Sequence, residues 1–147
     1  MTIIRITKVF NFEMAHSLKD HDGPCRNIHG HTYELFVTIS GSPRREEGHP
    51  ANGMLIDFKT LKDIVNKHIV QKYDHAFVVS SRSPWADNTQ AMHSKMIVLP
   101  FEPTSENLIN EFAGILKKEI PPEVNLHSLR LRETTTAYAE WYAEDND

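Results

Sequence analysis

Two histidines separated by a single residue, His29 and His31, open a stretch of alternating polar and apolar residues. Residues two apart on a β-strand project from the same face, so both imidazoles lie on the apolar side of this stretch. A third histidine, His16, ends an earlier alternating stretch and follows its apolar parity. Because an antiparallel pairing brings these two ends together, the three imidazoles are predicted to meet.

Three neutral imidazoles around one divalent ion leave a fourth coordination position open, which is the arrangement of catalytic zinc sites. The alternative is three unrelated histidines, and a bare His-x-His pair favours that alternative. The additional histidine at a converging strand end shifts the balance towards a metal centre. The spacing therefore favours Zn²⁺ binding by His16, His29 and His31.

A single cysteine, Cys25, lies four residues before His29, in a polar loop between Pro24 and Arg26. A lone cysteine is most often a small buried residue. Here a metal ion or the neighbouring arginine would favour its thiolate form. The spacing leaves two chemical roles open: a fourth zinc ligand that closes the site, or an acid–base group.

Three carboxylate and imidazole groups later in the chain are further candidates. Asp74 and His75 are adjacent, and a carboxylate beside a histidine orients the ring and supports its protonated form, although such pairs also arise by chance. Glu133 shares parity with Leu129 and Leu131, so its carboxylate is predicted to face inward, where it needs a partner or a ligand. Two glutamate oxygens suit the N–H/NH2 edge of a pterin.

The elements that position these residues follow from the periodicity, and together they predict an α+β fold. Asp57 is a predicted helix cap. The run Thr104, Ser105 and Glu106 is predicted to begin a second helix, and helix capping alone can explain why these residue types stand there. Strands are predicted over 4–16, 29–39, 54–56, 95–100 and 127–139, helices over 58–69 and from 104 to the prolines at 121 and 122, and a loop over 80–94.

Length and composition narrow the class of protein. The 147 residues suit one domain over 1–147. A net charge of −4 without a clustered basic surface argues against nucleic acid and anionic membranes as partners. The single cysteine excludes an internal disulfide. The first residues lack the features of a signal peptide, and a cytoplasmic location is therefore expected.

The motifs together resemble the 6-pyruvoyltetrahydropterin and 6-carboxytetrahydropterin synthase family, in order through nearly the whole chain. Six motifs in sequence are far more specific than any one of them. They are His16 at a strand end, Cys25-Arg26-Asn27-Ile28-His29-Gly30-His31, Asp57-Phe58-Lys59-Thr60-Leu61-Lys62, Asp74-His75, Pro103-Thr104-Ser105-Glu106-Asn107 and Glu133-Thr134.

The resemblance implies the tunnelling fold, a four-stranded antiparallel sheet with two helices on one face. Copies of such a chain close their sheets into a barrel, and two trimers stack into a homohexamer with sites between subunits. The resemblance implies zinc binding by His16, His29 and His31, and a small-molecule pterin substrate. The residues implied in proton transfer are Cys25, Asp74, His75 and Glu133. Those implied in substrate binding are Thr104, Ser105 and Glu106, with Glu106 as the anchor of the pterin ring.

Within the family, the spacing Cys-x3-His-Gly-His resembles the bacterial 6-carboxytetrahydropterin synthases of queuosine biosynthesis. Their substrate is 7,8-dihydroneopterin triphosphate, and they release acetaldehyde and triphosphate. The alternative within the family is the pyruvoyl-forming synthase. A non-catalytic zinc-binding oligomerisation domain is an alternative of another class. A cupin-type metal oxygenase also carries His-x-His on a strand, but two helices do not suit that fold.

Overall fold

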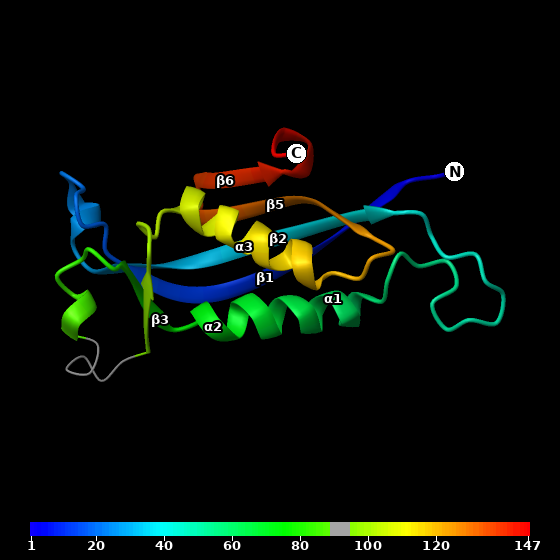
Figure 1. Cartoon of the computed structure of the whole chain (residues 1–147), viewed down its shortest axis with the longest axis horizontal. Helices are drawn as coiled ribbons and strands as arrows, with labels where there is room; N and C mark the ends of the chain where they lie inside the picture. Colours follow the sequence, from blue (N-terminus) through cyan, green and yellow to red (C-terminus); the bar gives the residue numbers. More distant parts are fainter. Residues whose placement is uncertain (89–94) are drawn as a thin grey trace.

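A computed structural model describes residues 1–88 and 95–147, and within them six strands form one sheet. The order across the sheet is β4-β3-β1-β2-β5-β6 (Figure 1). The strands are β1 Ile4–His16, β2 His29–Gly41, β3 Ala76–Ser80, β4 Met96–Leu99, β5 Asn125–Thr134 and β6 Ala137–Tyr142. Residues 89–94 of the predicted loop lie outside the described part of the chain.

The sheet combines an antiparallel unit with a parallel extension. Neighbours in the unit β1-β2-β5-β6 are antiparallel, whereas β3 runs parallel to β1 and β4 runs parallel to β3. The expectation of a four-stranded antiparallel sheet therefore holds for that unit but is wrong for the described sheet as a whole. The fully buried β3 lacks the polar–apolar alternation by which a half-buried strand is recognised in a sequence.

Two further expectations about the strands are wrong. Residues 54–56 form no strand, and the last two of them are buried in the core. The single strand predicted over 127–139 is instead the hairpin of β5 and β6, with its turn at Thr135 and Thr136. This turn was missed because threonine favours strands and because the turn contains no glycine or proline that would mark it in the sequence.

Both predicted helices are present, and they begin at the predicted caps. The Oδ1 atom of Asp57 accepts a hydrogen bond from Lys59 N at 2.8 Å, and Oγ1 of Thr104 accepts one from Asn107 N at 3.1 Å. The helical elements are α1 Phe58–Val65, a π-helical segment Asn66–Val70, α2 Gln71–Tyr73 and α3 Ser105–Glu119. Single 3₁₀ turns lie at Pro24–Arg26, Ala86–Asn88 and Ala143–Asp145.

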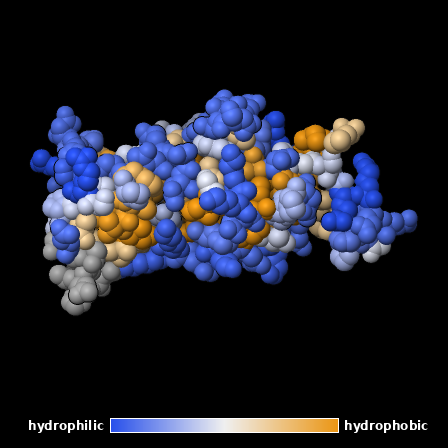
Figure 2. All heavy atoms as spheres, in the orientation of Figure 1, coloured by the Kyte–Doolittle hydropathy of each residue, from blue (hydrophilic) through white to orange (hydrophobic). Residues whose placement is uncertain are grey.

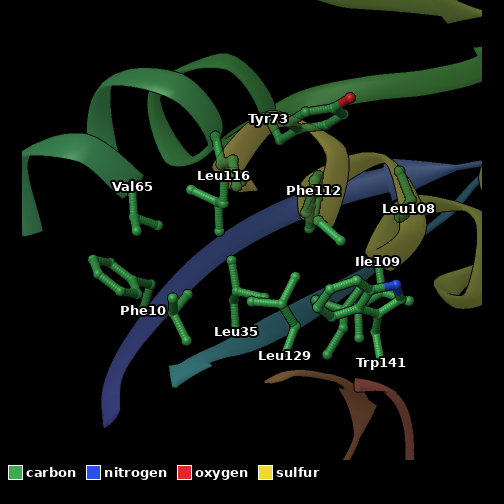
Figure 3. Close-up of a cluster of buried hydrophobic side chains, with 14 of the residues drawn as sticks. Phe10, Leu35, Val65, Tyr73, Leu108, Ile109, Phe112, Leu116, Leu129 and Trp141 are labelled. Carbon is green, nitrogen blue, oxygen red and sulfur yellow. The ribbon is translucent and has the colours of Figure 1, made fainter. Parts of the chain in front are cut away.

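The helices cover one face of the sheet, as predicted, and the core lies between the two layers (Figure 1). Figure 3 shows Phe112 and Leu116 of α3 beside Leu35 of β2 and Leu129 of β5. These four side chains are at most 1% exposed. The alternating parity of β1, β2 and β5 thus supplies the wall on which both helices pack.

The outer surface of the helical layer is mainly polar. Figure 2 shows hydrophilic residues over most of this side of the molecule, with hydrophobic patches between them. Within the described residues, no helix is long and apolar enough to cross a membrane.

The core packing predicts a contrast between two neighbouring positions on α1. Leu61 is 0% exposed, whereas the next residue, Lys62, lies on the exposed side. Leu61→Ala should lower the free energy of unfolding by about 2–5 kcal/mol, because it leaves a cavity in the core. Lys62→Ala should change it by no more than about 0.5 kcal/mol. Urea unfolding followed by circular dichroism measures both, and equal effects would contradict this packing.

Candidate active site

The pairing of β1 with β2 brings the three predicted metal ligands together. His16 lies opposite His29, and Met14 lies opposite His31, so the three imidazoles share the helix-facing side of the sheet. Their ring centroids are 4.5, 5.2 and 5.0 Å apart. One nitrogen of each ring lies within 4.8 Å of the corresponding atoms of the other two. The three rings are therefore close enough to bind a single ion.

Backbone carbonyls fix the orientation of two of the rings. Nδ1 of His16 lies 2.8 Å from the Pro103 carbonyl oxygen, and Nδ1 of His29 lies 2.8 Å from that of Asn27. A carbonyl oxygen only accepts, so each Nδ1 carries the proton and each Nε2 keeps a lone pair. These two Nε2 atoms are 2.9 Å apart. Lone pairs so close repel each other unless a cation lies between them, and the residues present therefore fit a zinc ion.

The local environment lowers the pKa of two of these imidazoles. Burial lowers the pKa of His16, helped by the nearby His29 and His31 and opposed by the Pro103 carbonyl and Glu133. Burial also lowers the pKa of His31, with Glu133 opposing and His29 reinforcing the shift. A metal binds only the unprotonated ring, so a depressed pKa favours metal binding.

Glu133 faces the histidines, in agreement with its predicted parity. Its Oε1 atom lies 3.6 Å from Nε2 of His16 and 3.6 Å from Nε2 of His31. The same oxygen accepts a hydrogen bond from the Tyr33 hydroxyl at 3.3 Å. Tyr33 was not among the predicted site residues, although it continues the parity of His29 and His31 on β2. Burial raises the pKa of Tyr33, and the neighbouring Glu133 raises it further.

Cys25 lies on the loop between β1 and β2 and is not part of the group of three histidines. It sits on the 3₁₀ turn Pro24–Arg26 and is half-buried. Its carbonyl accepts a hydrogen bond from Leu18 N at 2.9 Å, and the Ser17 hydroxyl donates to the Arg26 carbonyl at 2.7 Å. These bonds hold the turn against the end of β1. The group of candidate metal ligands in the described part of the chain comprises His16, His29 and His31 and does not include Cys25.

Asp74 and His75 are held on β1 by its backbone. Oδ1 of Asp74 accepts from Glu13 N at 2.9 Å and lies 3.0 Å from Nδ1 of His75. His75 has a positive φ of 62°, and its own N–H donates to the Glu13 carbonyl. Such a conformation is uncommon outside glycine and is frequent at functional sites. The hydrogen bond from Glu13 N lowers the pKa of Asp74, and His75 and Lys95 lower it further.

The His75 ring is exposed and lines a cavity of about 430 Å³ that His31 also lines. Within the described residues, no hydrogen bond or ion pair joins Cys25 to Asp74 or His75. The described part of one chain thus places His75 at the cavity lined by His31, with no hydrogen bond or ion pair to Cys25.

The start of α3 reaches the opposite side of the site. Glu106 and Glu133 line a common cavity of about 420 Å³, together with Ser105 and Tyr138. Among the described residues the buried hydroxyl of Ser105 has no hydrogen-bond partner, whereas that of Thr104 is engaged in the helix cap. Glu133 also lines a cavity of about 690 Å³ with His31. His31 of the cluster therefore lines two of these cavities, and Glu133 lines one of them together with the third.

This combination of fold and site defines a class of protein. A family model described as "6-pyruvoyl tetrahydropterin synthase" matches residues 5–144, and the chain belongs to this family. The "6-carboxy-5,6,7,8-tetrahydropterin synthase" of Haemophilus influenzae is 39% identical over 143 residues, which cover 95% of this chain and 99% of the relative. The protein of the same name from Aquifex aeolicus is 28% identical over 164 residues, with coverage of 95% and 98%.

Solved structures support the fold. An uncharacterized protein from Wolinella succinogenes superposes with a TM-score of 0.81 at 21% identity, over 97% of this chain and 99% of the other. The 6-pyruvoyl tetrahydropterin synthase of Caenorhabditis elegans superposes with a TM-score of 0.70 at 23% identity, over 97% of both chains.

The geometry of the cluster predicts its metal binding. Chelator-treated protein should bind one Zn²⁺ per chain. His31→Ala should weaken the affinity at least about 100-fold, since the loss of even an outer-shell partner costs about 10–100-fold. His68→Ala is the matched control, because His68 pairs with Glu119 outside the cluster. Competition with a chromophoric chelator measures the affinities, and equal affinities for the two variants would contradict the assignment.

Proposed function

We propose that the chain is a zinc-dependent 6-carboxy-5,6,7,8-tetrahydropterin synthase that acts as one domain. It converts 7,8-dihydroneopterin triphosphate and one water molecule to 6-carboxytetrahydropterin, acetaldehyde and triphosphate, a reaction of queuosine biosynthesis. The observation that carries the proposal is the cluster of His16, His29 and His31 beside cavities lined by Glu106 and Glu133. The 39% identity to the Haemophilus influenzae enzyme supports the carboxy-forming reaction.

The three histidines would hold the zinc ion through one ring nitrogen each. When bound, the ion supplies Lewis-acid polarisation of a substrate oxygen. The carboxylates of Glu106 and Glu133 line one cavity and can accept hydrogen bonds from the N–H/NH2 edge of a pterin. In this role Glu106 anchors the ring, and Ser105, whose hydroxyl lacks a partner, together with Thr104 assists it.

Proton transfer is assigned to groups on two sides of the substrate. The Cys25 thiolate removes a proton from the pterin side chain, and His75 exchanges a proton from the other side. Asp74 fixes the His75 ring through the contact to Nδ1 at 3.0 Å, so that Nε2 faces outward. Glu133 lies close enough to both the histidines and the pterin cavity to serve the same relay.

The separation of Cys25 from His75 supports an oligomer in which a second copy completes each site. The sheet has unpaired outer edges at β4 and β6 in the described chain, and hydrogen-bonding groups on such edges can pair with another copy. We therefore propose that copies close their sheets into a barrel and that two trimers form a hexamer. Cys25 of one copy would then face the Asp74–His75 pair of another.

A pyruvoyl-forming synthase is the second candidate, favoured by the description of the matching family. Both reactions expel triphosphate and differ in the fate of the side chain. A non-catalytic zinc-binding oligomerisation domain is the candidate of another class, and it would yield no product.

Product analysis decides among these candidates. The zinc-loaded protein is incubated with 7,8-dihydroneopterin triphosphate, and acetaldehyde is measured by reduction coupled to alcohol dehydrogenase and NADH. We expect acetaldehyde in equal amount to triphosphate. Triphosphate with a diketo side chain would establish the pyruvoyl-forming reaction instead. No turnover by the zinc-loaded protein would favour the non-catalytic domain.

The role of Cys25 has a test of its own. Cys25→Ala should lower kcat by about 10²–10⁴-fold, since it removes the proton acceptor, and should leave the zinc content at one ion per chain. Cys25→Ser conserves the shape of the side chain and tests whether the loss is chemical. Loss of zinc from Cys25→Ala would show that the thiol is a ligand.

A further inference from the structure

The metal centre has a fourth candidate ligand besides the three histidines. Oε1 of Glu133 is 3.6 Å from Nε2 of both His16 and His31. Two ligand atoms on one tetrahedral zinc ion, each about 2.1 Å from it, lie about 3.4 Å apart. Among the described residues Glu133 lies within 4.0 Å of two of the three histidines, and a shift of its carboxylate towards His29 would let it bind the ion. Such a site would be closed, as in structural zinc sites, with no position for a substrate.

The Tyr33 hydroxyl forms a hydrogen bond to the Glu133 oxygen that would otherwise be able to bind the zinc ion. It donates to Oε1 of Glu133 at 3.3 Å. The ring of Tyr33 is 0% exposed and is held in place, stacked on Phe12 with centroids 5.3 Å apart and edge-on to His31 at 5.6 Å. The Tyr33 hydroxyl also lies 3.5 Å from Nδ1 of His16, a nitrogen that carries a proton, so the oxygen that can accept a proton from this hydroxyl is Oε1 of Glu133. A donor fixed in this way restricts where the Glu133 carboxylate can lie, because a displaced carboxylate loses this hydrogen bond.

We propose that Tyr33 is a positioning residue that keeps the fourth coordination position open. By hydrogen-bonding to Oε1, it retains the Glu133 carboxylate beside the ion and not on it. The carboxylate thereby stays free to accept protons or hydrogen bonds in the pterin cavity, which it also lines. The inference rests on the zinc site of the proposed function and is independent of which pterin product forms.

The test measures the open position without any substrate. The Co²⁺-loaded protein is titrated with azide, which binds a vacant position and changes the visible absorption. Wild type should bind azide, and Tyr33→Phe should bind it at least about tenfold more weakly, because the released carboxylate occupies that position. Tyr33→Phe should also bind Zn²⁺ at least about tenfold more tightly. The double variant Tyr33→Phe/Glu133→Gln should regain the wild-type azide affinity.

Tyr73→Phe provides the matched control. Tyr73 is also 0% exposed, but its hydroxyl has no hydrogen-bond partner, so its removal should change neither azide nor Zn²⁺ affinity. Tyr33→Phe with azide and Zn²⁺ affinities equal to wild type, or with weaker Zn²⁺ binding, would overturn the inference while leaving the metal centre in place. If the wild-type protein bound neither Zn²⁺ nor Co²⁺, both this inference and the metal site of the proposed function would be overturned.

Discussion

The antiparallel register of β1 and β2 is the constraint on which the site depends. It places His16 opposite His29 and brings His31 two pairs further along, all on the helix-facing side. A slip of one residue would turn the histidines of one strand to the other side of the sheet. The register is fixed by burial, since the same parity carries Phe12 of β1 and Leu35 of β2, which are 2% and 0% exposed. The hydrophobic core thus aligns the metal ligands, and no loop has to position all three.

The site begins where the buried, helix-facing side of β1 and β2 ends. Its polar side chains form hydrogen bonds with main-chain groups of neighbouring segments. The rings of His16 and His29 are oriented by carbonyl groups, and Asp74 is bound by a main-chain N–H of β1. Main-chain partners are insensitive to side-chain substitution, so the orientation of these groups is protected against much sequence change. Tyr33 marks the transition, because its ring belongs to the core and its hydroxyl belongs to the site.

The features that local periodicity encodes could be predicted from the sequence: the long strands β1 and β2, the caps at Asp57 and Thr104, and the convergence of the three histidines. Features that are set by non-local contacts could not be predicted from local periodicity. The strand β4 was predicted over 95–100, whereas the short strand β3 was not, and the parallel pairing of both is defined by their neighbours in the sheet. The turn at residues 135 and 136 is made of strand-favouring threonine. The contact of Tyr33 with Glu133 joins residues 100 positions apart. The separation of Cys25 from His75 depends on the three-dimensional path of the chain, which spacing does not reveal.

The π-helical segment Asn66–Val70 has a consequence for how this helix can evolve. The fully buried residues of the helix recur every fourth position, at Leu61, Val65, Ile69 and Tyr73. In a regular α-helix, steps of four drift by roughly 40° each, so such a row would wind away from the sheet. The wider turn absorbs this drift and delivers Asp74 and His75 to the edge of β1. Deletion of a single residue here would restore an ordinary helix and rotate that pair by roughly 100°, so insertions and deletions within this stretch would change where Asp74 and His75 lie.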